Sequence, residues 1–198
     1  MGASEINLLE LATAYRALAS GVVAQPYVVR EVLRGSGNAI PMSRKAPVPL
    51  AVDRFTLALI QEGLRGVVRM PTGTAHALTA RTFPIPVMGK TGTTNDFKDA
   101  LFVGSTYGID GITVAVRIGF DDSRSLGSRE TGGRLALPVF REVMLRVYGD
   151  KIAGAVPPFP RGIEQRITAY LTAPPPLPVV GGDAPTLVSV VTRAPIPE

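Results

Sequence analysis

Residues 89–104 read GKTGTTNDFKDALFVG, and this stretch decides the fold because two extended segments meet within it across a short polar turn. Prolines from residue 83 onward keep the first segment extended, since each one biases its predecessor away from helix. The next two segments, DALFVGSTYG (99–108) and GITVAVRIGFDD (111–122), are apolar on both pleat faces. Such strands are typical of a sheet that is covered on both sides. Connections this short join antiparallel neighbours, so the sequence predicts a three-stranded antiparallel sheet.

Three helices are predicted around this sheet. Asn7 and Glu10 form an N-x-x-E capping box ahead of apolar residues at helical spacing, and Gly21 supplies the left-handed stop. A second helix is predicted over about residues 52–70 and a third over residues 135–149. The apolar stripe of the third helix consists of Val139, Phe140, Val143, Met144 and Val147.

The predicted fold class is α+β, with an antiparallel sheet flanked by helices, and the chain divides into three parts. Residues 1–153 contain the sheet and the three helices, and within them residues 25–40 predict two short strands around a Gly-Ser-Gly turn. Residues 154–173 form a terminal extension with room for one edge strand. Residues 174–198 carry prolines without periodicity and predict a disordered tail.

The composition excludes several kinds of chemistry. Without cysteine, the chain has no disulfide, no thiolate metal ligand and no cysteine nucleophile. Its single histidine, His76, is expected on the surface and cannot by itself make a histidine metal cluster or a Ser-His-Asp triad, so no metal or cofactor is expected. The net charge of +5 comes from singly scattered basic residues, which favours a solvated surface over nucleic-acid binding. No apolar run approaches the roughly 20 residues that span a bilayer.

Lys90 lies in a Gly-Lys-Thr triplet that two different sites could use. A phosphate-binding loop needs a glycine five residues before Gly89 and a helix beginning at the lysine. Here Pro84 occupies that position, Pro86 lies inside the would-be loop, and a strand follows. Because proline has no amide hydrogen to give a phosphate, the nucleotide interpretation fails.

The alternative places Lys-Thr-Gly-Thr on the edge of a sheet. There Lys90 supplies a fixed positive charge, and Gly92 leaves space for a substrate to lie against the strand. Hydroxyl groups of Thr91, Thr93 and Thr94 can donate hydrogen bonds to a carboxylate. These parts match the K-T-G element of serine enzymes that react with penicillin.

The wider sequence resembles class A penicillin-binding proteins, the bifunctional peptidoglycan synthases, over the C-terminal part of their transpeptidase domain. The resemblance implies part of a penicillin-binding, serine β-lactamase-like transpeptidase fold. It covers roughly residues 2–150. The segments that carry it are GASEINLLELATAYRALASG, VVRMPTGTA, GKTGTTNDFKDALFVG, VAVRIGFDD and ETGGRLALPVFREVM.

The resemblance also implies roles for individual residues. Lys90 would assist proton transfer around a serine nucleophile, and Thr91 with Thr93 would hold the terminal carboxylate of a peptidoglycan stem peptide ending in D-Ala-D-Ala. Gly92 and Thr94 belong to the same substrate-binding strand. β-Lactams would bind the complete domain, whose upstream half is the implied partner, at the extracytoplasmic face of a bacterial membrane. Gly132 and Gly133 are expected only to permit a tight loop.

Two departures from the family pattern keep a second interpretation open. No serine in the chain is followed three residues later by lysine, so the family's S-x-x-K nucleophile is missing. The triplet Ser36 to Asn38 imitates the S-x-N element but falls in a predicted turn. One interpretation is therefore a piece of a D,D-transpeptidase, inert by itself. The other is a truncated or interaction module with the same fold and no catalytic role.

Overall fold

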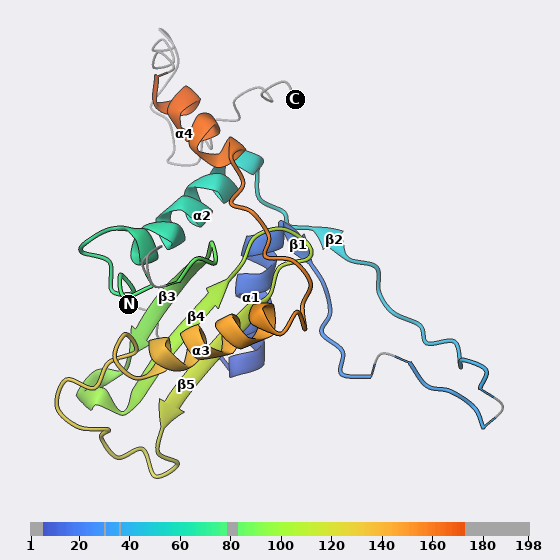
Figure 1. Cartoon of the computed structure of the whole chain (residues 1–198), viewed down its shortest axis with the longest axis horizontal. Helices are drawn as coiled ribbons and strands as arrows, with labels where there is room; N and C mark the ends of the chain where they lie inside the picture. Colours follow the sequence, from blue (N-terminus) through green and yellow to red (C-terminus); the bar gives the residue numbers. More distant parts are fainter. Residues whose placement is uncertain (1–5, 30, 36, 79–82, 173–198) are drawn as a thin grey trace, which may run out of the picture.

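The computed structural model describes residues 6–29, 31–35, 37–78 and 83–172, and it confirms the predicted α+β fold (Figure 1). The tail predicted at residues 174–198 lies outside the described residues. The helices are α1 (Leu8–Ser20), α2 (Arg54–Arg69), α3 (Ala136–Gly149), α4 (Gly162–Thr172) and the 3₁₀ helix η1 (Asn95–Phe97). The strands are β1 (Val22–Val23), β2 (Val48–Pro49), β3 (Met88–Thr93), β4 (Asp99–Ser105) and β5 (Thr113–Gly119).

The central sheet has the strand order β3-β4-β5, and both pairs are antiparallel as predicted. In the register, Lys90 lies opposite Val103 and Thr91 lies opposite Phe102. The turn between β3 and β4 is η1, in which Asp96 and Phe97 have φ values of 59° and 54°. An aspartate tolerates this left-handed conformation better than most residues, which suits the polar turn predicted there.

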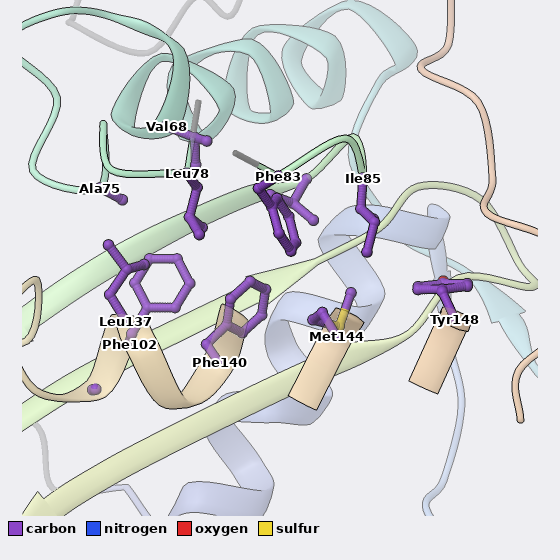
Figure 2. Close-up of a cluster of buried hydrophobic side chains, with 12 residues drawn as sticks. Val68, Ala75, Leu78, Phe83, Ile85, Phe102, Leu137, Phe140, Met144 and Tyr148 are labelled. Atoms are coloured by element: carbon purple, nitrogen blue, oxygen red, sulfur yellow. The ribbon is translucent and has the colours of Figure 1, made fainter. Parts of the chain in front are cut away.

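One face of the sheet is covered by α3 through an aromatic core (Figure 2). Phe140 of α3 is fully buried, and its ring lies edge-on to that of Phe102 of β4 with centroids 4.7 Å apart. The Phe83 ring lies with its centroid 6.3 Å from that of Phe140, and it extends the aromatic core toward the segment before β3. The stripe predicted on α3 is only partly right, because Val139 is 43% exposed. The buried residues of α3 are Ala136, Leu137, Phe140, Met144 and Tyr148.

The other face packs against α1 and contains a smaller core. This core contains Ala19 of α1, Ala58 of α2, Met88 of β3 and Ile163 of α4. It also contains Tyr107, which lies two residues beyond the end of β4. Both faces of the sheet are therefore covered, as the doubly apolar strands predicted.

Side chains before the first turns fix where α1 and α2 begin. The capping box predicted at Asn7 and Glu10 is confirmed, with both hydrogen bonds at 2.9 Å. Asp53 caps α2 by accepting from the amides of Phe55 and Thr56 at 3.0 and 2.9 Å. The hydrogen bonds from Thr56 hold the pKa of Asp53 below its ordinary value. Such caps satisfy amides that have no partner within the helix.

Residues 24–47 form an arm that extends away from the sheet (Figure 1). The two strands predicted over residues 25–40 are not formed, and the described residues there contain one isolated bridge, between Leu33 and Ala39. Val28 is fully exposed, and the other large apolar residues of the arm are exposed as well, so none of them packs into a core of the described residues. The Arg44 guanidinium lies 3.7 Å above the Tyr27 ring and donates to Val29 O at 2.8 Å. β1 and β2 pair at the base of the arm.

The edge strand expected in residues 154–173 is wrong, because the segment forms helix α4 (Gly162–Thr172). Helix α4 packs against α2 and adds no strand to the sheet (Figure 1). Within the described ranges, no helix combines the length and hydropathy needed to cross a bilayer.

Candidate active site

Strand β3 presents the predicted site residues at an edge of the sheet. Among the described residues β3 pairs with β4 alone, so its other edge carries no strand partner. Lys90 is exposed, and its Nζ donates to Thr91 O at 2.8 Å. Because side chains alternate along a strand, Lys90 and Gly92 lie on the face toward α1, whereas Thr91 and Thr93 lie on the face toward α3. An ammonium group has three donors, so two have no partner among the described residues and can serve a ligand.

Thr91 is tied to the loop that follows α2. Its Oγ1 lies 2.6 Å from Thr74 Oγ1, and either hydroxyl can be the donor. One of the two hydroxyls donates its hydrogen to the other. The hydroxyl that accepts can therefore still donate its own hydrogen to a third group. Gly73 permits this approach, since a Cβ there would lie 2.2 Å from Val67 O. The sequence alone missed Thr74 as a site residue, although the PTGTA segment that contains it marked the loop.

Thr93 is held by the loop before α3. The Gly132 amide donates to Thr93 Oγ1 at 3.2 Å, which leaves the Thr93 hydroxyl hydrogen available. A Cβ on Gly132 would lie 2.0 Å from Leu101 O and 2.5 Å from Gly92 O. Gly132 therefore lets the loop press against the β3–β4 pair, in agreement with the tight loop expected there.

Thr94 and the residues after it serve the turn. Thr94 Oγ1 accepts from the Asp99 amide at 2.7 Å, and the Thr94 amide donates to Asp99 O at 3.1 Å. Asp99 also accepts from Arg117 Nη2 at 2.6 Å, which identifies the carboxylate partner of that arginine. The Thr94 hydroxyl thus closes the turn, whereas Thr91 and Thr93 belong to β3 itself.

A groove of about 850 Å³ runs beside Lys90. Its walls come from α2, the loop at residues 70–74 and Ile167 of α4. Glu62 and Arg69 of α2 bring charges of both signs to it. Leu59 and Val67 of α2 and Met70 of the loop are the apolar side chains of these walls. The arrangement suits a ligand that has an anionic group near Lys90 and an apolar body.

His76 lies in the segment after α2 and is half-buried, not on the surface as expected. Its Nδ1 is buried and has no hydrogen-bond partner among the described residues. Within those same residues, no group of three or more metal-binding side chains comes together.

Comparisons with known proteins agree with this geometry. The family described as "Penicillin binding protein transpeptidase domain" matches residues 1–145. Penicillin-binding protein 1A of Neisseria cinerea is 34% identical over 149 residues, which are 73% of this chain and 18% of the relative. The chain thus spans about a fifth of the length of that curated relative.

Two solved structures are similar in fold. The D,D-transpeptidase domain of a peptidoglycan glycosyltransferase from Eggerthella lenta is 30% identical, with a TM-score of 0.54 over 72% of this chain and 33% of that one. Penicillin-binding protein 1A from Haemophilus influenzae has a TM-score of 0.60 over 76% and 27%; at 23% identity it shows the fold alone. The resemblance seen in the sequence is confirmed. The chain belongs to the penicillin-binding protein transpeptidase domain family.

Proposed function

We propose that this chain is the C-terminal part of a serine D,D-transpeptidase domain that cross-links peptidoglycan stem peptides outside the cytoplasmic membrane of a bacterium. The observation that carries the proposal is the position of Lys90, Thr91 and Thr93 on an edge strand beside a groove, in a chain of the transpeptidase family. The nucleophilic serine comes from residues upstream of this chain, since no S-x-x-K motif occurs in it.

The reaction has two steps, and this chain acts in both through β3. The upstream serine Oγ attacks the carbonyl of the D-Ala-D-Ala amide, its proton passes to the leaving amine, and the terminal D-Ala departs. An amine of a second stem peptide then attacks the serine ester, which forms the cross-link and returns the proton to the serine. Lys90 provides the positive charge that favours these proton transfers near the nucleophile. Penicillin undergoes only the first step, in which it acylates the serine, because its ring amide mimics the scissile bond.

Thr91 and Thr93 hold the substrate carboxylate in this proposal. Each threonine keeps a way to donate, since the Thr93 hydroxyl only accepts from Gly132 and the Thr91–Thr74 pair uses one of its two hydrogens. Gly92 lets the peptide lie against the strand. Thr94, whose hydroxyl accepts from Asp99, contributes to this strand through its backbone and the turn.

The test compares the 198-residue chain with the protein that contains it, expressed with its upstream reading frame. Both are exposed to a fluorescent penicillin and analysed by intact mass and peptide mapping. We expect a stoichiometric adduct on the longer protein, outside residues 1–198, and none on the chain alone. Lys90→Ala in the longer protein should slow labelling by about 100-fold or more, the scale of general acid–base catalysis.

Each other outcome overturns a defined part of the proposal. An adduct on the isolated chain would show that it holds a nucleophile of its own. Normal labelling of the Lys90→Ala protein would remove Lys90 from the reaction. If the longer protein takes up no penicillin, or if a stop codon separates the upstream motifs from Met1, the chain is a non-catalytic module with this fold.

A further inference from the structure

Helix α4 lies outside the residues that match the family, yet it is built into the site. The family match ends at residue 145, whereas α4 spans Gly162–Thr172 and packs along α2. Ile163 is 1% exposed and belongs to the core that contains Met88 of β3. Ile167 packs at the edge of this core and lines the same groove as Lys90. The extension is thus part of the domain and forms one wall of the groove.

An aromatic contact anchors the segment that leads into α4. The Phe159 ring meets Tyr107 edge-on, with centroids 5.3 Å apart and an interplanar angle of 87°. The Arg65 guanidinium of α2 lies over the Phe159 ring, 3.8 Å from its centroid. Such aromatic and cation–π contacts add to the burial of the rings themselves.

Glu164 joins α4 to two arginines of α2. Its Oε1 accepts from Arg65 Nη2 at 2.6 Å and from Arg69 Nη1 at 3.0 Å. The Arg65 side chain is only 12% exposed, and its Nε also pairs with Glu62 at 2.9 Å. Hydrogen bonds from Arg65 and then Arg69 hold the pKa of Glu164 below its ordinary value. The Glu164 carboxylate therefore stays ionised at neutral pH, and the two arginines converge on it.

A continuous series of contacts leads from these arginines to the K-T-G-T strand. Arg69 is the last residue of α2, and the following loop is fastened to that end of the helix by Gly73 N to Met70 O at 2.8 Å and Ala75 N to Val67 O at 3.0 Å. Thr74 of this loop then meets Thr91 Oγ1 at 2.6 Å. A shift of the end of α2 would move Thr74 and change the direction in which the Thr91 hydroxyl points.

We propose that Glu164 is a positioning residue for the transpeptidase site, acting through Arg65, Arg69 and the loop at residues 70–74 on Thr91. In the same arrangement Ile167 sets how much apolar volume the groove beside Lys90 accepts. This inference rests on the proposed function for its consequence in binding, whereas the contacts that carry it belong to the chain itself. It assigns a role in carboxylate recognition to a helix beyond the family's matched residues.

The matched pair for the test is Glu164→Gln and Glu142→Gln. Glu142 of α3 is a suitable control because its side chain is 55% exposed, close to the 56% of Glu164. It also lies 2.6 Å from an arginine, Arg146, the same distance as that between Glu164 and Arg65. The first measurement is hydrogen exchange of the 198-residue chain. Glu164→Gln should accelerate exchange in α4 and also in residues 70–75, whereas Glu142→Gln should leave both segments unchanged. Acceleration confined to α4 would overturn the coupling to the loop.

The second measurement uses the longer protein and fluorescent penicillin, with binding and acylation separated by varying the drug concentration. Glu164→Gln should weaken the initial, non-covalent binding by about 3- to 10-fold, the usual scale of coupling between sites, and leave the limiting acylation rate unchanged. A general loss of folding would lower both quantities, and this result would overturn the positioning role. If even the unmodified protein takes up no penicillin, the proposed function fails, and the exchange data decide the coupling by themselves.

Discussion

The two faces of the sheet are held by different forces. The α3 face is an aromatic and aliphatic core around Phe102 and Phe140, and its described members are all apolar or aromatic. The α1 face has a smaller core, and its outer part is fastened by the ion pairs of Glu164 with Arg65 and Arg69. The stabilisation from burial grows with the apolar area that is buried and does not depend on screening by salt. Exposed ion pairs contribute little stability, and salt screens them. The strand that carries Lys90 thus has one face held by apolar burial, called here the firm face, and one whose outer part depends on ion pairs, called here the adjustable face.

The firm face is tested most severely by Phe140→Ala. Phe140 is completely buried and contacts the rings of Phe102 and Phe83, so its removal leaves a cavity that the sheet cannot fill. We expect a loss of about 3–5 kcal/mol in the free energy of unfolding, measured by urea denaturation. Val139→Ala is the control on the same helix, since Val139 is partly exposed and should cost well under that. Equal losses in the two variants would contradict the assignment of this face as the main core.

The contact between the loop and β3 is tested by Gly132→Ala. The added Cβ would lie 2.0 Å from Leu101 O, so the loop must move away from β3. We expect a loss of about 1–3 kcal/mol, as for other overpacked sites, with faster hydrogen exchange in residues 88–93. Gly149→Ala is the control, because a Cβ at the end of α3 meets nothing within 4 Å. A neutral Gly132→Ala variant would show that the loop does not rest on the strand.

The smallest effect is expected on the α1 face, from Tyr107→Phe. The Tyr107 hydroxyl is buried and has no hydrogen-bond partner among the described residues, so its removal should change stability by less than about 1 kcal/mol and in the favourable direction. Burial raises the pKa of Tyr107 above its ordinary value of 10.0. Ionisation therefore favours the unfolded chain. The contribution of Tyr107 to stability is therefore complete below pH 10 and is lost as the pH rises above it.

The Tyr107→Phe variant should not show the loss of stability above pH 10 that ionisation of Tyr107 causes. Urea unfolding at pH 8 and pH 11 checks both statements, and Tyr27→Phe on the exposed arm is the control for stability at pH 8. A large loss of stability in Tyr107→Phe at pH 8 would mean that the hydroxyl has a partner, and the α1 face would then be less adjustable than its packing indicates.

Local signals in the sequence were enough for the central fold. The capping box at Asn7, the alternating prolines before β3 and the short connection between the strands each act within a few residues, and each prediction was right. Helix α4 was not predictable in this way, because prolines and glycine precede it and its stability comes from Ile163 packing on α2 and the sheet. The prediction of strands in the arm failed for the opposite reason, since its strand-like residues are exposed and pack on no core of the described residues.

The candidate site was partly predictable for the same reason. The K-T-G-T motif identified Lys90 and the threonines, since the motif is contiguous. The motif does not predict contacts with residues that are distant in the sequence. Two such contacts are the hydrogen bond between Thr91 and Thr74 and the ion pair between Arg117 and Asp99. Strand register decides the ion pair, because Asp99 and Arg117 lie on the neighbouring strands β4 and β5. The Thr91–Thr74 hydrogen bond depends instead on how the loop after α2 packs on β3.

The projecting arm has a consequence for how the chain behaves when it is cut. Its exposed backbone offers arginines and a lysine to a trypsin-like protease far from the sheet, and a nick there would sever α1 from the remainder of the sequence. Helix α1 would nevertheless stay attached, because Ala17 and Ala19 are buried and Arg16 donates to Ser105 Oγ and Gly108 O. We therefore expect the two pieces to stay associated after a nick in the arm, which makes the arm a suitable position for splitting the protein or inserting a reporter.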